Sequence, residues 1–100
     1  MLTYKAAYQY VDGGIHAHVL DYPGAITCGE TLNEARRLLA SALLDLASLS
    51  LDRGESLPVP DPSLSDFEAD IEEPIHLHLR VNTAVDRVPA GVVVSSSGTT

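Results

Sequence analysis

The sequence contains few of the residues that mark secreted, membrane or metal-cluster proteins. It has no tryptophan, only five aromatic residues (four tyrosines and one phenylalanine), and Cys28 as its sole cysteine. One cysteine excludes an internal disulfide and a thiolate zinc cluster, and it fits a reducing compartment. The first residues lack the apolar core of a signal peptide, and no apolar run approaches the ~18 residues of a membrane span. We therefore expect a soluble, cytoplasmic protein.

Basic residues are also scarce. Six Lys and Arg stand against fourteen Asp and Glu, which gives a formal net charge of −8. Phosphate backbones are bound by clustered Lys and Arg, so this surface is a poor match for free nucleic acid. A basic protein is the more natural partner, because opposite fields speed encounter.

The length of 100 residues predicts one domain with a thin, aliphatic core. We place that domain at residues 1–82 and a C-terminal extension at 83–100, with a short strand at Val92–Val94 and a disordered tail from Ser95 onward.

Alternating residues near the start predict an antiparallel meander. Leu2 to Val11 alternates, Asp12-Gly13-Gly14 supplies a tight turn, and Ile15 to Leu20 alternates again. Pro23-Gly24 forms the next turn, and Ala25 to Cys28 makes a short third strand. The inward faces carry the following residues: Leu2, Tyr4, Ala6, Tyr8, Tyr10, Ile15, Ala17 and Val19.

A helical period then runs over about residues 31–53. Thr31 and Glu34 have capping-box spacing, in which the Thr31 hydroxyl accepts from the Glu34 amide and the Glu34 carboxylate reaches the Thr31 amide. Gly54 and the prolines after it end the helix. The expected core stripe consists of Leu32, Ala35, Leu39, Ala42, Leu46 and Leu49. Further apolar residues widen it, and either a partner covers them or they are tolerated at the surface: Ala40, Leu43, Leu44, Ala47 and Leu51.

Residues 61–73 form an acidic linker with six carboxylates and no base. Ser65 and Glu68 repeat the capping-box spacing, so a turn or two of helix fits here, ended by Pro74. The cleanest alternation, at 75–81, predicts the last main strand. It follows a helical connection, so we expect it to lie beside and parallel to the first strand. The fold class is α+β, with β-β-β-α-β order, a meander covered by one long helix, and sheet order 3-2-1-4.

This series of motifs resembles the HicB family of antitoxins. The matching elements are Asp12-Gly13-Gly14, Pro23-Gly24, Thr27-Cys28-Gly29-Glu30-Thr31, Glu34-Ala35 and Pro58-Val59-Pro60. The resemblance implies a truncated ribonuclease-H-like sheet and, as partner, a HicA toxin, which is a small basic ribonuclease. Many such antitoxins continue into a DNA-binding domain. Residues 82–100 are too few and too poor in bases for one, so direct DNA binding is not expected.

Two other kinds of site are weighed and set aside. His16/His18 and His76/His78 could each present two imidazoles on one strand face, but the predicted order separates the pairs by about 9.5 Å. We therefore expect no metal, no cofactor and histidines on a solvent face. Asp12 and Asp21 sit at turns rather than on central strands, and Cys28 has no evident base, so no catalytic residues are predicted.

The sequence thus predicts a non-enzymatic protein that binds and masks a small basic toxin. The candidate contact residues are Tyr22, Pro23, Leu43, Leu44, Leu51, Asp66, Glu68 and Asp70. A homo-dimer or tetramer is expected. Two alternatives stay open: a stand-alone oligomeric scaffold or ligand-binding domain without a toxin, and a relic ribonuclease-H-like enzyme or RNA binder.

Overall fold

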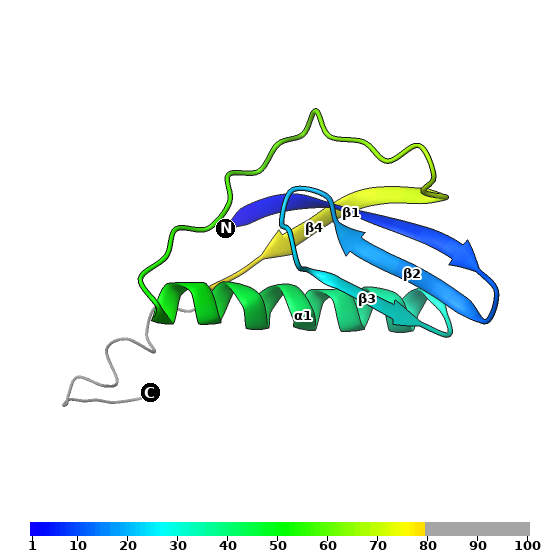
Figure 1. Ribbon diagram of the computed structural model, residues 1–100, viewed down its shortest axis with the longest axis horizontal. Coiled ribbons are helices and arrows are strands. Elements are labelled where there is room, and N and C mark those ends of the chain that lie inside the picture. The colour runs from blue at the N-terminus through cyan, green and yellow to red at the C-terminus, as the bar shows by residue number, and fades with distance from the viewer. Residues whose placement is uncertain (80–100) are drawn as a thin grey trace.

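In the computed structural model, which describes residues 1–79, a four-stranded sheet packs on one long helix (Figure 1). The elements are β1 (Leu2–Val11), β2 (Gly14–Val19), β3 (Ile26–Gly29), α1 (Leu32–Asp52) and β4 (Ile71–Leu77). The strand order is β3-β2-β1-β4, which confirms the predicted order.

The β1–β2 hairpin closes where the sequence places it. Val11 pairs with Gly14, so Asp12 and Gly13 form a two-residue turn, and Gly13 has a φ of 86°. Gly14 has a different role. A Cβ atom at this position would lie 2.6 Å from the backbone oxygen of Gly29, because β3 ends directly against the start of β2. The absence of a side chain at Gly14 therefore allows the two strands to meet.

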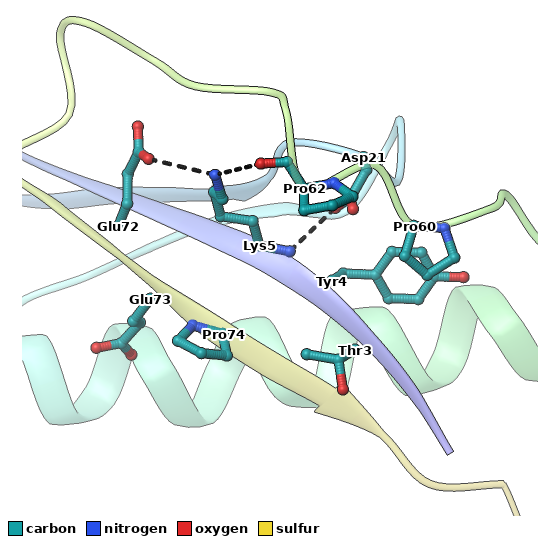
Figure 2. Close-up of a pocket in the computed structure, with 9 residues that line it drawn as sticks. All are labelled: Thr3, Tyr4, Lys5, Asp21, Pro60, Pro62, Glu72, Glu73 and Pro74. Carbon is teal, nitrogen blue, oxygen red and sulfur yellow. Dashed lines mark hydrogen bonds and ion pairs between the residues drawn. The ribbon is translucent and has the colours of Figure 1, made fainter.

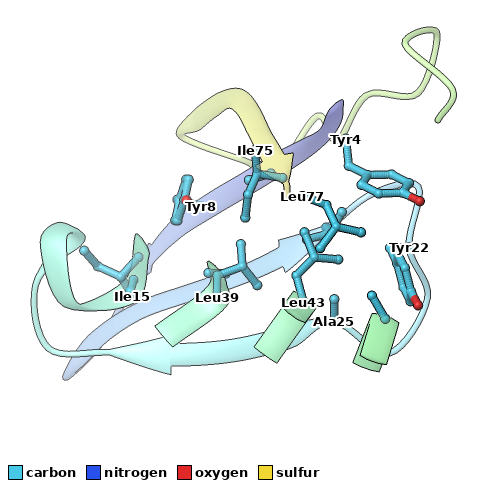
Figure 3. Close-up of a cluster of buried hydrophobic side chains, with 14 residues drawn as sticks. Tyr4, Tyr8, Ile15, Tyr22, Ala25, Leu39, Leu43, Ile75 and Leu77 are labelled. Carbon is cyan, nitrogen blue, oxygen red and sulfur yellow. The ribbon is translucent and has the colours of Figure 1, made fainter. Parts of the chain in front are cut away.

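The core lies between the sheet and α1 (Figure 3). Alternate residues of β1 and β2 point inward as predicted, except that Tyr10 is 56% exposed near the hairpin turn. Leu39 and Leu43 point from the helix toward the sheet and are almost fully buried. With no tryptophan available, the largest fully buried side chains besides these leucines are Tyr4 and Tyr8.

The helix begins at the predicted cap, with one difference. The Glu34 amide donates to the Thr31 hydroxyl at 3.1 Å, but the Glu34 carboxylate accepts from the Glu30 amide at 2.7 Å rather than from Thr31. At the other end, Glu55 N–H donates to the Ser50 carbonyl and Gly54 N–H to that of Leu51. This is a Schellman motif, which Gly54 allows with a φ of 76°.

The predicted core stripe of the helix was partly wrong. The buried helix residues are Ala35, Leu39, Leu43 and Ala47, an unbroken i, i+4 series. Ala42 and Leu46 are half-buried, and Leu49 is 46% exposed. The stripe therefore drifts around the helix toward Leu43 and Ala47 instead of following Ala42 and Leu49.

The last strand differs from prediction in both position and direction. It begins at Ile71 and ends at Leu77, instead of covering 75–81, and it runs antiparallel to β1. Residues 61–70 form turns rather than a helix, and Pro74 lies within the strand. Pro74 pairs with Lys5 of β1. The Lys5 N–H donates to Asp21 and the Lys5 carbonyl accepts from the Leu20 amide, so both backbone groups of Lys5 point away from β4. Pro74 therefore turns its nitrogen toward the free edge, where no ladder hydrogen bond is lost.

The direction of β4 follows from the linker, residues 54–70. Helix α1 carries the chain about 30 Å along one face of the sheet. The linker then returns along the opposite face, so the chain re-enters the sheet at the end from which α1 started (Figure 1). A parallel strand would follow if α1 were the only segment that ran along the sheet between β3 and β4. Because the linker runs along the sheet a second time, β4 points in the opposite direction.

Hydrogen bonds fasten the linker to the sheet. Asp21, only 7% exposed, accepts from the Lys5 amide at 3.0 Å with one oxygen and from the Asp61 amide at 2.8 Å with the other. The Lys5 ammonium donates to the carbonyls of Pro62 and Leu64 at 3.1 and 2.7 Å. The structure thus has three layers: helix, sheet and linker.

The predictions for Val81, for a strand at Val92–Val94 and for a tail from Ser95 concern residues outside the described range. The division into 1–82 and 83–100 stays a prediction.

We expect Gly14→Ala to destabilise the fold by about 1–3 kcal/mol, because the new methyl group meets backbone rather than a movable side chain. Urea unfolding measures the change. Gln9→Ala, on the neighbouring strand, is the control and should stay within about 0.5 kcal/mol of wild type. Equal stability of Gly14→Ala and wild type would contradict the close contact.

We also expect Asp21→Asn to loosen the linker. An amide keeps the size of the side chain but sets an N–H donor against one of two backbone amides, at a cost of about 1–3 kcal/mol. Hydrogen exchange over residues 57–70 should accelerate. Glu68→Gln makes the same acid-to-amide change at an exposed site and should leave exchange unaltered; equal exchange in the two variants would rule out this role of Asp21.

Candidate functional site

The predicted contact residues from the turn and the helix divide into buried and exposed groups. Leu43 is 1% exposed and Tyr22 is 4% exposed, so both belong to the core. Leu44 and Leu51 are 44% and 48% exposed, and their spacing of seven places them on one flank of α1. Pro23 is also exposed. The structure therefore leaves Pro23, Leu44 and Leu51 available to a partner.

The predicted acidic contacts lie on the other side of the molecule, in residues 61–70, which we call the acidic loop. Two of its carboxylates help to hold its shape. Asp66 accepts from the Glu68 amide at 2.9 Å and lies 3.7 Å from the His18 imidazole, and Asp70 accepts from the Tyr10 amide at 2.7 Å. The Glu68 carboxylate makes no hydrogen bond or ion pair with any residue in 1–79.

Sequence reasoning missed the most exposed apolar side chain of this loop. Phe67 is 100% exposed, between Asp66 and Glu68. Single exposed apolar side chains are common on protein surfaces, but a ring with no covered area leaves both of its faces open to a partner. The available signal was that the chain's single phenylalanine falls in its most acidic stretch.

The next two acids are committed to the fold. Glu72 accepts from the Asp66 amide and the Ser65 hydroxyl, and these bonds lower its carboxyl pKa. Glu73 takes two hydrogen bonds from Arg36 at 2.8 and 2.9 Å, which hold its pKa below the usual range. Because both values are lowered, the stabilisation is present above the ordinary carboxyl pKa and is lost as the pH falls through the lowered values.

Arg36 and Glu73 also cover a buried tyrosine. The Arg36 guanidinium lies 6.0 Å from the centre of the Tyr8 ring. Burial, followed by the nearby Glu73 charge, raises the pKa of Tyr8 to about 12. Tyr8 therefore stays neutral near pH 7 and acts as a packing residue.

A cavity of about 570 Å³ lies beneath the linker, where Pro60 and Pro62 face Lys5 and Pro74 (Figure 2). Its polar side chains already have partners within the protein. The Lys5 ammonium and Asp21 hold the linker, and the Thr3 hydroxyl lies 3.0 Å from His76 Nδ1. A ligand would find few unpaired polar groups here.

The two histidine pairs lie on the outer face of the sheet. His16 pairs with Gln9, His18 with Ala7 and His76 with Thr3, so β1 separates the two pairs. Within residues 1–79, no group of three or more His, Cys, Asp or Glu side chains is arranged to hold a metal ion. Cys28 is exposed and lies opposite His16.

The sheet edges formed by the described residues are poor templates for strand addition. On β4, Pro74 removes a donor at the centre of the free edge. On the opposite side, β3 is only four residues long. Residues 1–79 contain no helix that is both long and apolar enough to cross a membrane.

Comparison with known proteins finds matches at the level of structure. No protein-family model and no curated protein matches the sequence. The N-terminal domain of the Burkholderia pseudomallei antitoxin HicB aligns with a TM-score of 0.64 at 19% identity, over 78% of this chain and 100% of that domain. A longer structure of the same antitoxin gives 0.63 at 20% identity, over 96% of this chain and 76% of that one.

A chain from a HicA3–HicB3 toxin–antitoxin complex aligns with a TM-score of 0.62 at 17% identity, over 78% of this chain and 100% of that one. At these identities the similarity concerns the backbone arrangement. The chain has a HicB-like fold.

Proposed function

We propose that this protein is an antitoxin of a toxin–antitoxin pair, which binds and masks a small basic toxin of the HicA type. The observation that carries the proposal is the HicB-like fold, which matches the whole HicB N-terminal domain and a chain of a HicA3–HicB3 complex. The net charge of −8 complements a basic partner.

Masking requires surface rather than reactive groups. In the described part of the chain, the carboxylates with lowered pKa values are bound by protein donors, and the cavity beneath the linker has paired polar side chains. We therefore propose a non-enzymatic protein that acts without a metal or cofactor. The cytoplasmic location predicted from the sequence remains part of the proposal.

The surfaces offered to the toxin are Pro23 and the flank of α1 at Leu44 and Leu51, or the acidic loop with Asp66, Glu68 and Asp70. Tyr22 and Leu43 would support the first surface from within the core. Helix α1 and the acidic loop lie on opposite sides of the sheet (Figure 1), so mutations in Leu44 and Leu51 can be separated from mutations in the loop.

The second candidate function is a stand-alone oligomeric scaffold. Leu44, Leu49 and Leu51 favour it, because each is 44–48% exposed on the helix. Within residues 1–79, the blunted edges at Pro74 and β3 oppose assembly through the sheet, so a dimer or tetramer formed through α1 is the form of this candidate that the described surface favours.

Co-expression tests the proposal directly. With a HicA-type toxin encoded beside this chain's gene, we expect restored growth, a stoichiometric complex on co-purification, and affinity that falls as salt is raised. An unrelated acidic protein of similar size is the control. Growth arrest with no complex would refute an antitoxin role, and the same result from a chain that still self-associates would favour the scaffold.

A further inference from the structure

We propose that Phe67, with the Glu68 carboxylate beside it, is an anchor that receives an arginine side chain of the basic partner. This inference rests on the proposed function and names the contact within it. The ring is 100% exposed, so no residue in 1–79 covers either of its faces.

The backbone that carries this ring is held in place by hydrogen bonds on both sides of it. Before Phe67, Lys5 fastens the carbonyls of Pro62 and Leu64, and Asp21 fastens the Asp61 amide. After it, the Asp70 amide donates to the Tyr8 carbonyl at 2.8 Å. The chain is thus tied to the sheet on both sides of the ring, so little backbone entropy remains to be lost on binding.

The flanking acids have different roles. The Asp66 carboxylate points inward, where it accepts a hydrogen bond from the Glu68 amide and lies near the His18 imidazole. The Asp66 amide donates to the Glu72 carboxylate at 2.7 Å. These bonds shape the turn that carries Phe67. The Glu68 carboxylate has no partner within residues 1–79, so it is free to accept hydrogen bonds from outside.

A free aromatic face next to a free carboxylate suits a guanidinium group. The ring attracts a cation over its face, and the carboxylate accepts the guanidinium N–H groups. Arginine stacks on aromatic rings and is less strongly hydrated than lysine, which makes it the better fit. The surrounding negative charge selects a basic protein over a neutral apolar one.

The experiment measures toxin affinity of the full chain at low salt by calorimetry, with wild type, Phe67→Ala, Phe67→Leu, Glu68→Gln and Val59→Ala. We expect Phe67→Ala to weaken binding about tenfold or more, as an aromatic anchor does. Phe67→Leu keeps apolar area without the ring and should also weaken binding. Glu68→Gln should reduce affinity and its salt dependence.

Val59→Ala is the matched control, because it removes an apolar side chain that is 84% exposed on the linker, outside the acidic loop and outside the leucine flank of α1; it should change affinity by no more than about twofold. Phe67, Glu68 and Val59 all lie outside the core, so thermal melting should be nearly the same for all variants. If wild type binds and Phe67→Ala binds equally well, the anchor is wrong while the antitoxin function stands.

Two further outcomes would overturn the inference. If Phe67→Leu binds like wild type while Phe67→Ala does not, the contact is apolar and no arginine is recognised. If wild type itself does not bind the toxin, the proposed function fails and the anchor fails with it.

Discussion

The structure depends on one buried carboxylate. Asp21 lies two residues after the end of β2. Its two carboxylate oxygens accept hydrogen bonds from the amides of Lys5 on β1 and Asp61 on the linker. A buried carboxylate is tolerable only when its oxygens are paired, so these three segments are held in register together. The Lys5 ammonium then adds a second attachment a few residues further along the linker.

This attachment decides how the sheet is completed. Because the linker is fixed across the outer face, the chain must travel back along the sheet before it can form β4. The strand consequently enters antiparallel to β1, and Pro74 falls at an edge position that needs no donor. The inner face keeps its single helix, while the outer face gains a third layer made of turns.

The same arrangement gives the molecule two distinct surfaces. On one side, leucines line an exposed flank of α1; on the other, the acidic loop presents Phe67 and Glu68 on a backbone fixed at both ends. Most of the acidic side chains in and after this loop accept hydrogen bonds from the protein itself. The negative charge of the segment therefore has a structural role as well as an electrostatic one.

The sequence by itself determined the local structure: the β1–β2 hairpin, the Thr31 cap, the Gly54 stop and the inward faces of β1 and β2. Each depends on neighbours within a few residues, where turn chemistry and side-chain period are sufficient. The sequence could not predict which of Leu43, Ala42 and Leu49 would be buried, because apolar residues cover too wide an arc of the helix to show where its centre faces the sheet. The direction of β4 and the exposure of Phe67 were decided only by tertiary structure, because both depend on how the linker crosses the sheet. That path is held by contacts such as the one between Asp21 and Asp61, forty positions apart, which no local pattern encodes.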